Sequence, residues 1–100
     1  MEKWVMPKME LKGSDKQINW ATDIIAGVYT TANDNFKRAH DMQWPHADKW
    51  EEGFDQIISQ LEAFLSRVDQ AGVIITQREK FSSERILNLA NKYVNREALK

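Results

Sequence analysis

The sequence contains no cysteine among its 100 residues. This absence excludes a disulfide framework, a thiolate metal site and a thiol nucleophile. The sequence has only two prolines and four isolated glycines, and none of them lies in a glycine-rich phosphate-binding loop. It has no apolar run long enough for a membrane-spanning helix, and charged side chains interrupt residues 1–12. We therefore expect a cytoplasmic protein with no membrane partner.

The net charge is also close to zero, at −1, so the chain as a whole does not attract nucleic acid or anionic lipid. Hydrophobic residues make up 42% of the chain and charged residues 29%, which is typical of a folded domain. The length predicts one domain over residues 1–100. Within it, residues 46–71 are acidic on balance and residues 72–100 are basic on balance. We interpret this split as two neighbouring elements that complement each other.

The first helical pattern follows the pair Gly13-Ser14. Ser14 and Gln17 have the S-x-x-Q spacing of a capping box, in which each residue binds the backbone of the other. Apolar residues then recur at spacings of three and four. They are Ile18, Ala21, Ile25, Val28, Ala32, Phe36 and Ala39. This pattern predicts a helix over residues 14–40.

The second helical pattern has the clearest apolar face. Asp48 with Glu51 predicts a second capping box, and Ala71-Gly72 is typical of a helix end. The apolar positions between them cover about a third of the helical circle. They are Trp50, Phe54, Ile57, Ile58, Leu61, Phe64, Leu65 and Val68. The pattern predicts a helix over residues 46–71.

The start of the last helix has two alternatives. Residues 73–76 are mostly β-branched and suit an extended segment, but Thr76 also begins a capping-box spacing. Phe81 lies off the face formed by Ile86, Leu89, Ala90 and Tyr93, which favours a break near Ser82. We therefore predict a helix over residues 82–98. The expected fold is all-α, a compact three-helix bundle with an extended N-terminal arm over residues 1–12, either docked or free.

No constellation of side chains predicts catalysis, a cofactor or a metal site. His40, Asp41, His46 and Asp48 cluster in sequence, but their spacing matches no zinc or calcium pattern. The serines lack the G-x-S-x-G setting of a hydrolase nucleophile. The phase of the second helix places its carboxylates in solvent. We therefore expect that the protein is not an enzyme.

The tryptophans and one glycine are the candidate partner-binding residues. Trp4 and Trp44 fall in irregular segments, where a tryptophan either anchors a partner or covers an end of the core. Trp20 lies at the flank of the first helix, close in phase to Gly27 and Thr31. A glycine inside a helix costs about 1 kcal/mol relative to alanine, so Gly27 suggests the close approach of another helix. That helix is either one of the protein's own or a partner's.

A second set of residues favours nucleic acid. Arg78, Arg85, Lys92 and Arg96 are spaced to form a basic row near the last helix. Such a row contacts phosphates, and the last helix of a three-helix unit is often the recognition helix. Glu79 and Glu84 dilute the row, and the domain as a whole is slightly acidic.

Residues 11–21 carry the pattern L-x-G-S-x-K-Q-x-x-W-A. This segment resembles one found in uncharacterised phage and Gram-positive bacterial mobile-element proteins. The resemblance implies a source and assigns no activity. The same residues also have a structural explanation, because Gly13 turns the chain and Ser14 with Gln17 caps the helix.

The leading hypothesis is a small non-enzymatic interaction module, derived from a phage or mobile element, that binds a host or phage protein. An inhibitor of a host or defence protein fits this description. The alternative is a small DNA- or RNA-binding regulator that uses the basic third helix. The sequence leaves self-association open.

Overall fold

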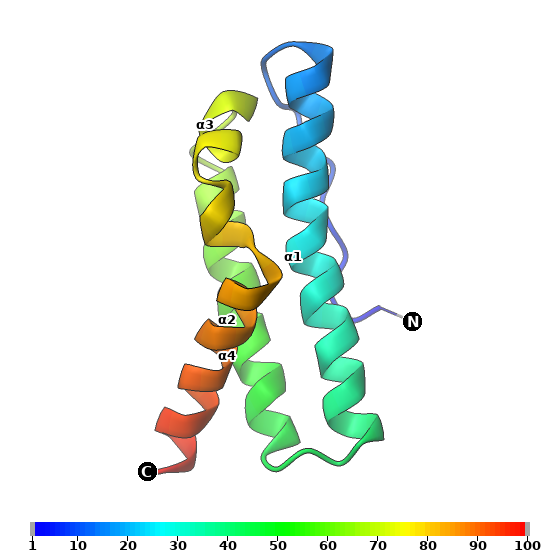
Figure 1. Ribbon diagram of the computed structural model, residues 1–100, viewed down its shortest axis with the longest axis vertical. Coiled ribbons are helices and arrows are strands. Elements are labelled where there is room, and N and C mark those ends of the chain that lie inside the picture. Colours follow the sequence, from blue (N-terminus) through cyan, green and yellow to red (C-terminus); the bar gives the residue numbers. More distant parts are fainter. Residues whose placement is uncertain (1, 100) are drawn as a thin grey trace.

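A computed structural model describes residues 2–99, and every regular element in this range is helical (Figure 1). The elements are α1 (Asp15–Asp41), α2 (Ala47–Leu65), α3 (Ala71–Thr76), the 3₁₀ helix η1 (Arg78–Phe81) and α4 (Ser83–Ala98). Helices α1 and α2 run antiparallel, and α4 runs back along α2 (Figure 1). None of the helices within residues 2–99 has the length and apolar character needed to cross a membrane. The all-α prediction is confirmed.

The start of α1 is confirmed in detail. The Ser14 hydroxyl accepts a hydrogen bond from the Gln17 backbone N–H at 3.2 Å, and the Gln17 side chain accepts one from the Ser14 N–H at 3.0 Å. This capping box satisfies backbone donors that have no partner within the helix. The helix then extends one residue beyond the predicted end, to Asp41.

The second helix begins within one residue of its predicted start, but its predicted capping box and its predicted C-terminal end are wrong. His46 precedes α2 in a left-handed conformation, with φ of 60°, and Asp48 lies inside the first turn without capping it. The helix stops at Leu65 because the chain then turns to pair with the arm. The Lys12 N–H donates to the Asp69 carbonyl at 2.7 Å, and the Ala71 N–H donates to the Lys12 carbonyl at 2.9 Å.

The segment over residues 73–76, for which an extended conformation was one alternative, is helical. Ala71 begins α3 and does not end α2, and Ala71 and Ile74 are fully buried. The packing of α3 against α1 outweighs the strand preference of its β-branched residues. The η1 helix follows, and Ser82 then caps α4 by accepting from the Arg85 N–H at 3.2 Å. Residues 2–99 therefore contain four α-helices where a three-helix bundle was predicted, although the break near Ser82 is confirmed.

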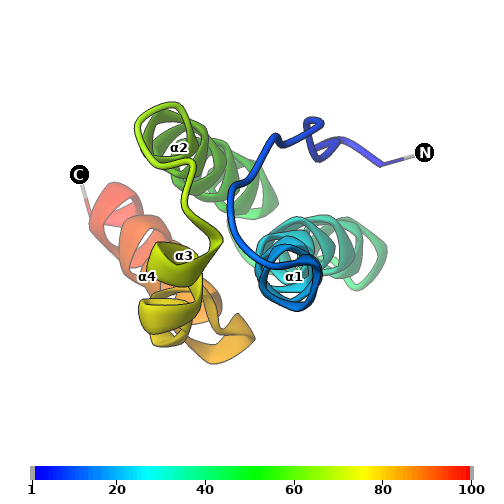
Figure 2. The ribbon, with the colours of Figure 1, turned by 90° about the horizontal axis from the view of Figure 1, so that it is seen from above.

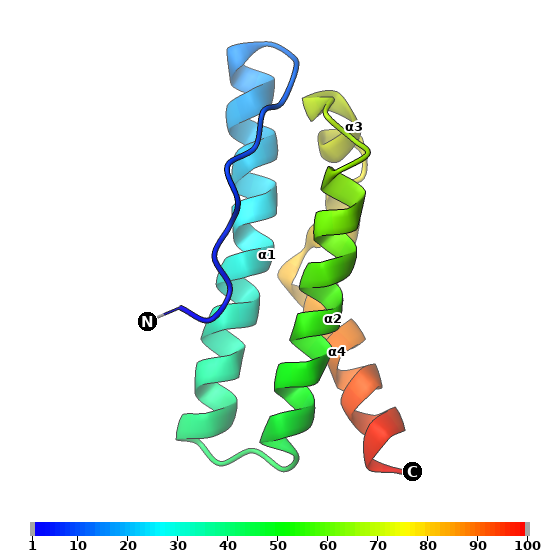
Figure 3. The same cartoon turned by 180° about the vertical axis from the view of Figure 1, so that it is seen from behind.

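The N-terminal arm lies along the seam between α1 and α2 (Figures 2 and 3). Trp4 is its anchor and joins a core built mainly from helix side chains. The fully buried large members of that core are Phe54, Ile25, Ile74 and Val28. The arm is therefore a docked part of the fold.

Two helical glycines differ in their surroundings, and we expect opposite responses to alanine. A Cβ at Gly27 has no neighbour within 4 Å, so Gly27→Ala should raise the free energy of unfolding by about 0.5–1 kcal/mol. A Cβ at Gly53 lies 3.2 Å from Tyr93 Cδ1, where α2 meets α4. Gly53→Ala should therefore lose most or all of that gain. Urea denaturation followed by circular dichroism measures both, and an equal gain at the two sites would contradict the packing difference.

Candidate interaction surface

Trp4, one of the predicted anchors, is a core residue. Only 7% of its surface is exposed, and its ring packs edge-on against Phe36 and Phe54. Its indole N–H donates to Asp55 Oδ1 at 2.7 Å, and its backbone N–H and C=O both bind the Asn33 side chain. Trp4 is therefore the contact between arm, α1 and α2, and it offers almost no surface to a partner.

Trp44 is half-buried in the turn between α1 and α2. Its ring meets that of Trp50 edge-on, with 5.3 Å between centroids, and its backbone N–H donates to the Ala39 carbonyl. These contacts fix the residue at one end of the core. Of the alternatives that the sequence offers, covering the end of the core fits this position.

Trp20 is the predicted anchor that remains accessible. Half of its surface is exposed on a well-capped helix. The guanidinium carbon of Arg78 lies 5.4 Å from the centroid of its ring. A cation over the face of an indole is attracted by the π-electrons, so Arg78 limits the motion of the ring without covering it fully.

Ile24 and Gly27 lie on the same side of α1 as Trp20. Ile24, one turn along the helix, is half-buried, and the space where a side chain at Gly27 would project is open. None of the described helices uses that space, so no close contact within residues 2–99 explains the glycine. Thr31 turns inward instead and shares a hydrogen bond of 2.8 Å with Ser83 at the start of α4. We name Trp20, Ile24, Gly27 and Arg78 the Trp20 surface.

The predicted basic row is divided between two elements. Arg78 belongs to η1, where it covers Trp20 and donates to the Ile75 carbonyl at 2.9 Å. Arg85, Lys92 and Arg96 remain on α4, where Lys92 and Arg96 line a hollow shared with α2 and Arg85 and Lys92 line a second hollow. Within residues 2–99, neither Arg85 nor Lys92 has a carboxylate within 4.0 Å.

The acidic side chains of α2 form ion pairs with a lysine of the arm and with a lysine of α2. Lys3 pairs with Glu51 at 2.6 Å, and Lys49 pairs with Glu52 at 3.3 Å. The contact from α4 is a neutral donor, because the Tyr93 hydroxyl donates to Glu52 at 3.2 Å. This hydrogen bond joins α4 to α2 through a neutral donor, so the predicted charge complementarity of the two segments stays a prediction.

The titratable group with the largest shift is a buried tyrosine. Burial, together with the adjacent Glu62 carboxylate, raises the pKa of Tyr29 to about 12. Its hydroxyl therefore stays protonated near neutral pH and donates to Glu62 at 3.3 Å. In the part of the chain that the structure describes, no three His, Asp or Glu side chains come together as a metal site.

The sequence indicated Trp20 as a candidate binding residue but did not indicate its contact with Arg78. Trp20 and Arg78 lie far apart in the sequence, and no local spacing connects them. Asn33 and Asp55, the polar partners of Trp4, were missed for the same reason. Comparison of the chain with protein-family models, with curated proteins and with solved structures found no match.

Proposed function

We propose that this chain is a small non-enzymatic interaction module that binds another protein through the Trp20 surface. One observation carries the proposal: a tryptophan keeps half of its surface in solvent while Arg78 holds its ring. Tryptophan and arginine are the residues that most often dominate binding energy at interfaces. A ring that is already positioned also loses less conformational entropy on binding.

Gly27 supports the same proposal. It costs the helix about 1 kcal/mol relative to alanine and serves no close contact within residues 2–99. The space where its side chain would project is open, so a partner can approach the helix there. The partner is expected to be a host or phage protein.

The test is affinity capture from a nuclease-treated lysate of the native host, quantified by mass spectrometry. We expect Trp20→Ala to reduce a near-stoichiometric partner by at least about tenfold, as for an interface anchor worth about 1.4 kcal/mol or more. Leu89→Ala is the matched control, because it removes another exposed apolar side chain from a different helix. A partner retained equally by both variants would contradict the proposed surface.

A second candidate function is nucleic-acid binding by α4. The cations Arg85 and Lys92 favour it, with Arg96 alongside and Asn88 and Asn91 on the same hollow as Arg85 and Lys92. If the three cations bind phosphates, retention on duplex DNA should fall steeply with salt. Replacing all three by alanine should then reduce the slope of log K against log salt by about 0.9 for each phosphate that is no longer neutralised. No retention at low salt would eliminate this candidate.

A further inference from the structure

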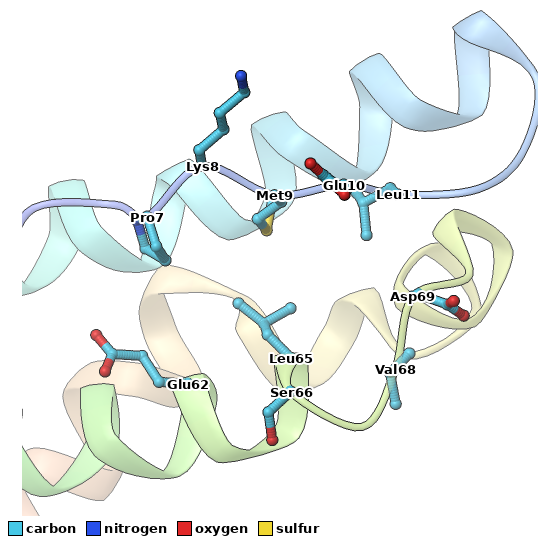
Figure 4. Close-up of a pocket in the computed structure, with 10 residues that line it drawn as sticks. All are labelled: Pro7, Lys8, Met9, Glu10, Leu11, Glu62, Leu65, Ser66, Val68 and Asp69. Atoms are coloured by element: carbon cyan, nitrogen blue, oxygen red, sulfur yellow. The ribbon is translucent and has the colours of Figure 1, made fainter.

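An open slot separates the N-terminal arm from the C-terminal part of α2 (Figure 4). Its volume is about 380 Å³. Met9 and Leu11 of the arm point toward α2, and Leu65 of α2 points back toward them (Figure 4). All three side chains are only half-buried. Another apolar group that entered the slot would remove this surface from water, which is favourable.

The opening of the slot argues against a small-molecule site. Sites for small molecules enclose most of the ligand, whereas this slot is open and is lined by the arm, the end of α2 and the segment after it (Figure 4). An open site of this size fits one or two side chains that project from a larger molecule.

The charges around the slot favour a cation. Glu10, Glu62 and Asp69 line it together with one lysine, Lys8, whose side chain points away from α2 (Figure 4). The Glu62 carboxylate also accepts the hydrogen bond from the neutral Tyr29 hydroxyl and keeps its charge. Lys12 partly offsets Asp69, with 3.1 Å between the charged atoms, but both side chains are largely exposed. A partner with a lysine or arginine beside its apolar group would complement this surplus of negative charge.

The backbone of the arm supplies a further set of contacts. The arm is fixed near its start, where Trp4 binds Asn33, and at its end, where Lys12 pairs with the segment after α2. Between these points the backbone of residues 5–11 makes no hydrogen bond to another residue within 2–99. The arm runs over the outside of the bundle (Figure 3), so a second extended chain can reach these groups.

We infer that the slot binds an extended segment of a partner protein, which inserts an apolar side chain next to a lysine or arginine. The inference rests on the proposed interaction function and specifies the chemistry of a partner contact. It concerns a surface distinct from that of Trp20, so the two can be tested separately.

The experiment is a selection of random nine-residue peptides on the immobilised full chain. We expect the recovered peptides to carry an apolar residue beside lysine or arginine. Their affinity should fall about threefold with Glu10→Lys, which reverses one exposed charge, and roughly tenfold with Met9→Lys, which places a charge in the slot. Glu84→Lys, an exposed charge reversal on α4, should leave the affinity unchanged. Methylating alternate backbone nitrogens of a peptide should also weaken its binding.

Circular dichroism identifies any variant that fails to fold. If Met9→Lys unfolds the protein, Glu10→Lys still tests the slot, because Glu10 is exposed. Recovery of acidic peptides only, or of none, overturns the inference. So does binding that Glu10→Lys leaves unchanged. Peptides that bind the slot variants normally but are lost with Trp20→Ala also overturn it, and would place their site on the Trp20 surface. If Trp20-dependent capture from lysate succeeds while the slot yields no peptide, the proposed function stands and only this inference fails.

Discussion

Replacing Trp4 by alanine is expected to lower the free energy of unfolding by about 3–5 kcal/mol, the usual cost of removing a large buried aromatic side chain. The ring packs against Phe36 and Phe54, and its N–H is bound by Asp55. Its loss leaves a cavity between the arm, α1 and α2 and leaves Asp55 without this donor. Urea denaturation followed by far-ultraviolet circular dichroism measures the change without depending on tryptophan fluorescence.

Two variants place this result in context. Trp4→Phe keeps an aromatic ring but loses the bond to Asp55, so its cost should be smaller, about 1–3 kcal/mol. Trp20→Ala removes the same type of residue from a half-exposed position and should cost less than Trp4→Ala. Equal losses for Trp4→Ala and Trp20→Ala would show that the arm does not hold Trp4 in the core.

Replacing Asn33 by alanine is expected to cost about 2–6 kcal/mol. Its side-chain oxygen accepts from the Trp4 backbone N–H at 3.0 Å, and its amide nitrogen donates to the Trp4 carbonyl at 2.8 Å. Both backbone groups belong to a residue that is buried, so removing the amide leaves each without a partner, at about 1–3 kcal/mol apiece. Urea denaturation gives the loss in stability, and hydrogen exchange at the Trp4 N–H should show that its protection is lost.

Asn35 is a close control, because it is an equally buried asparagine on the same helix. Within residues 2–99, its side chain donates only to the Thr31 carbonyl of α1. Alanine loses that bond but has a higher helix propensity, so Asn35→Ala should change stability by less than about 1 kcal/mol. A similar cost at both positions would mean that burial alone, and not the pairing with Trp4, makes Asn33 important.

These two predictions also bear on the proposed binding surfaces. Trp4 and Asn33 fix the beginning of the arm, and the arm forms one wall of the slot opposite Leu65. Variants that release the arm should therefore remove peptide binding at the slot. They should affect capture through Trp20 less, because the Trp20 surface is built from α1 and η1.

The helical periodicity and the start of α1 were predictable because they depend on neighbouring residues. Ser14 and Gln17 are three positions apart, so their reciprocal bonds form whenever the helix does. The apolar residues of α1, α2 and α4 recur with the helical period, and this is enough to predict the all-α class. The half-exposed position of Trp20 at the flank of its helix follows from the same phase.

The tertiary structure alone decided which of the other features are buried, bound or free. Residues 73–76 have a strand-like composition but belong to α3, because helix formation buries Ala71 and Ile74 against α1. By sequence, Trp4 either anchors a partner or covers an end of the core. Asn33 and Asp55, which are distant in sequence, bind its polar groups and hold it in the core. Arg78 leaves the basic row because Trp20 lies beside η1. In each case the deciding energy comes from contacts between residues far apart in the chain, which no local spacing encodes.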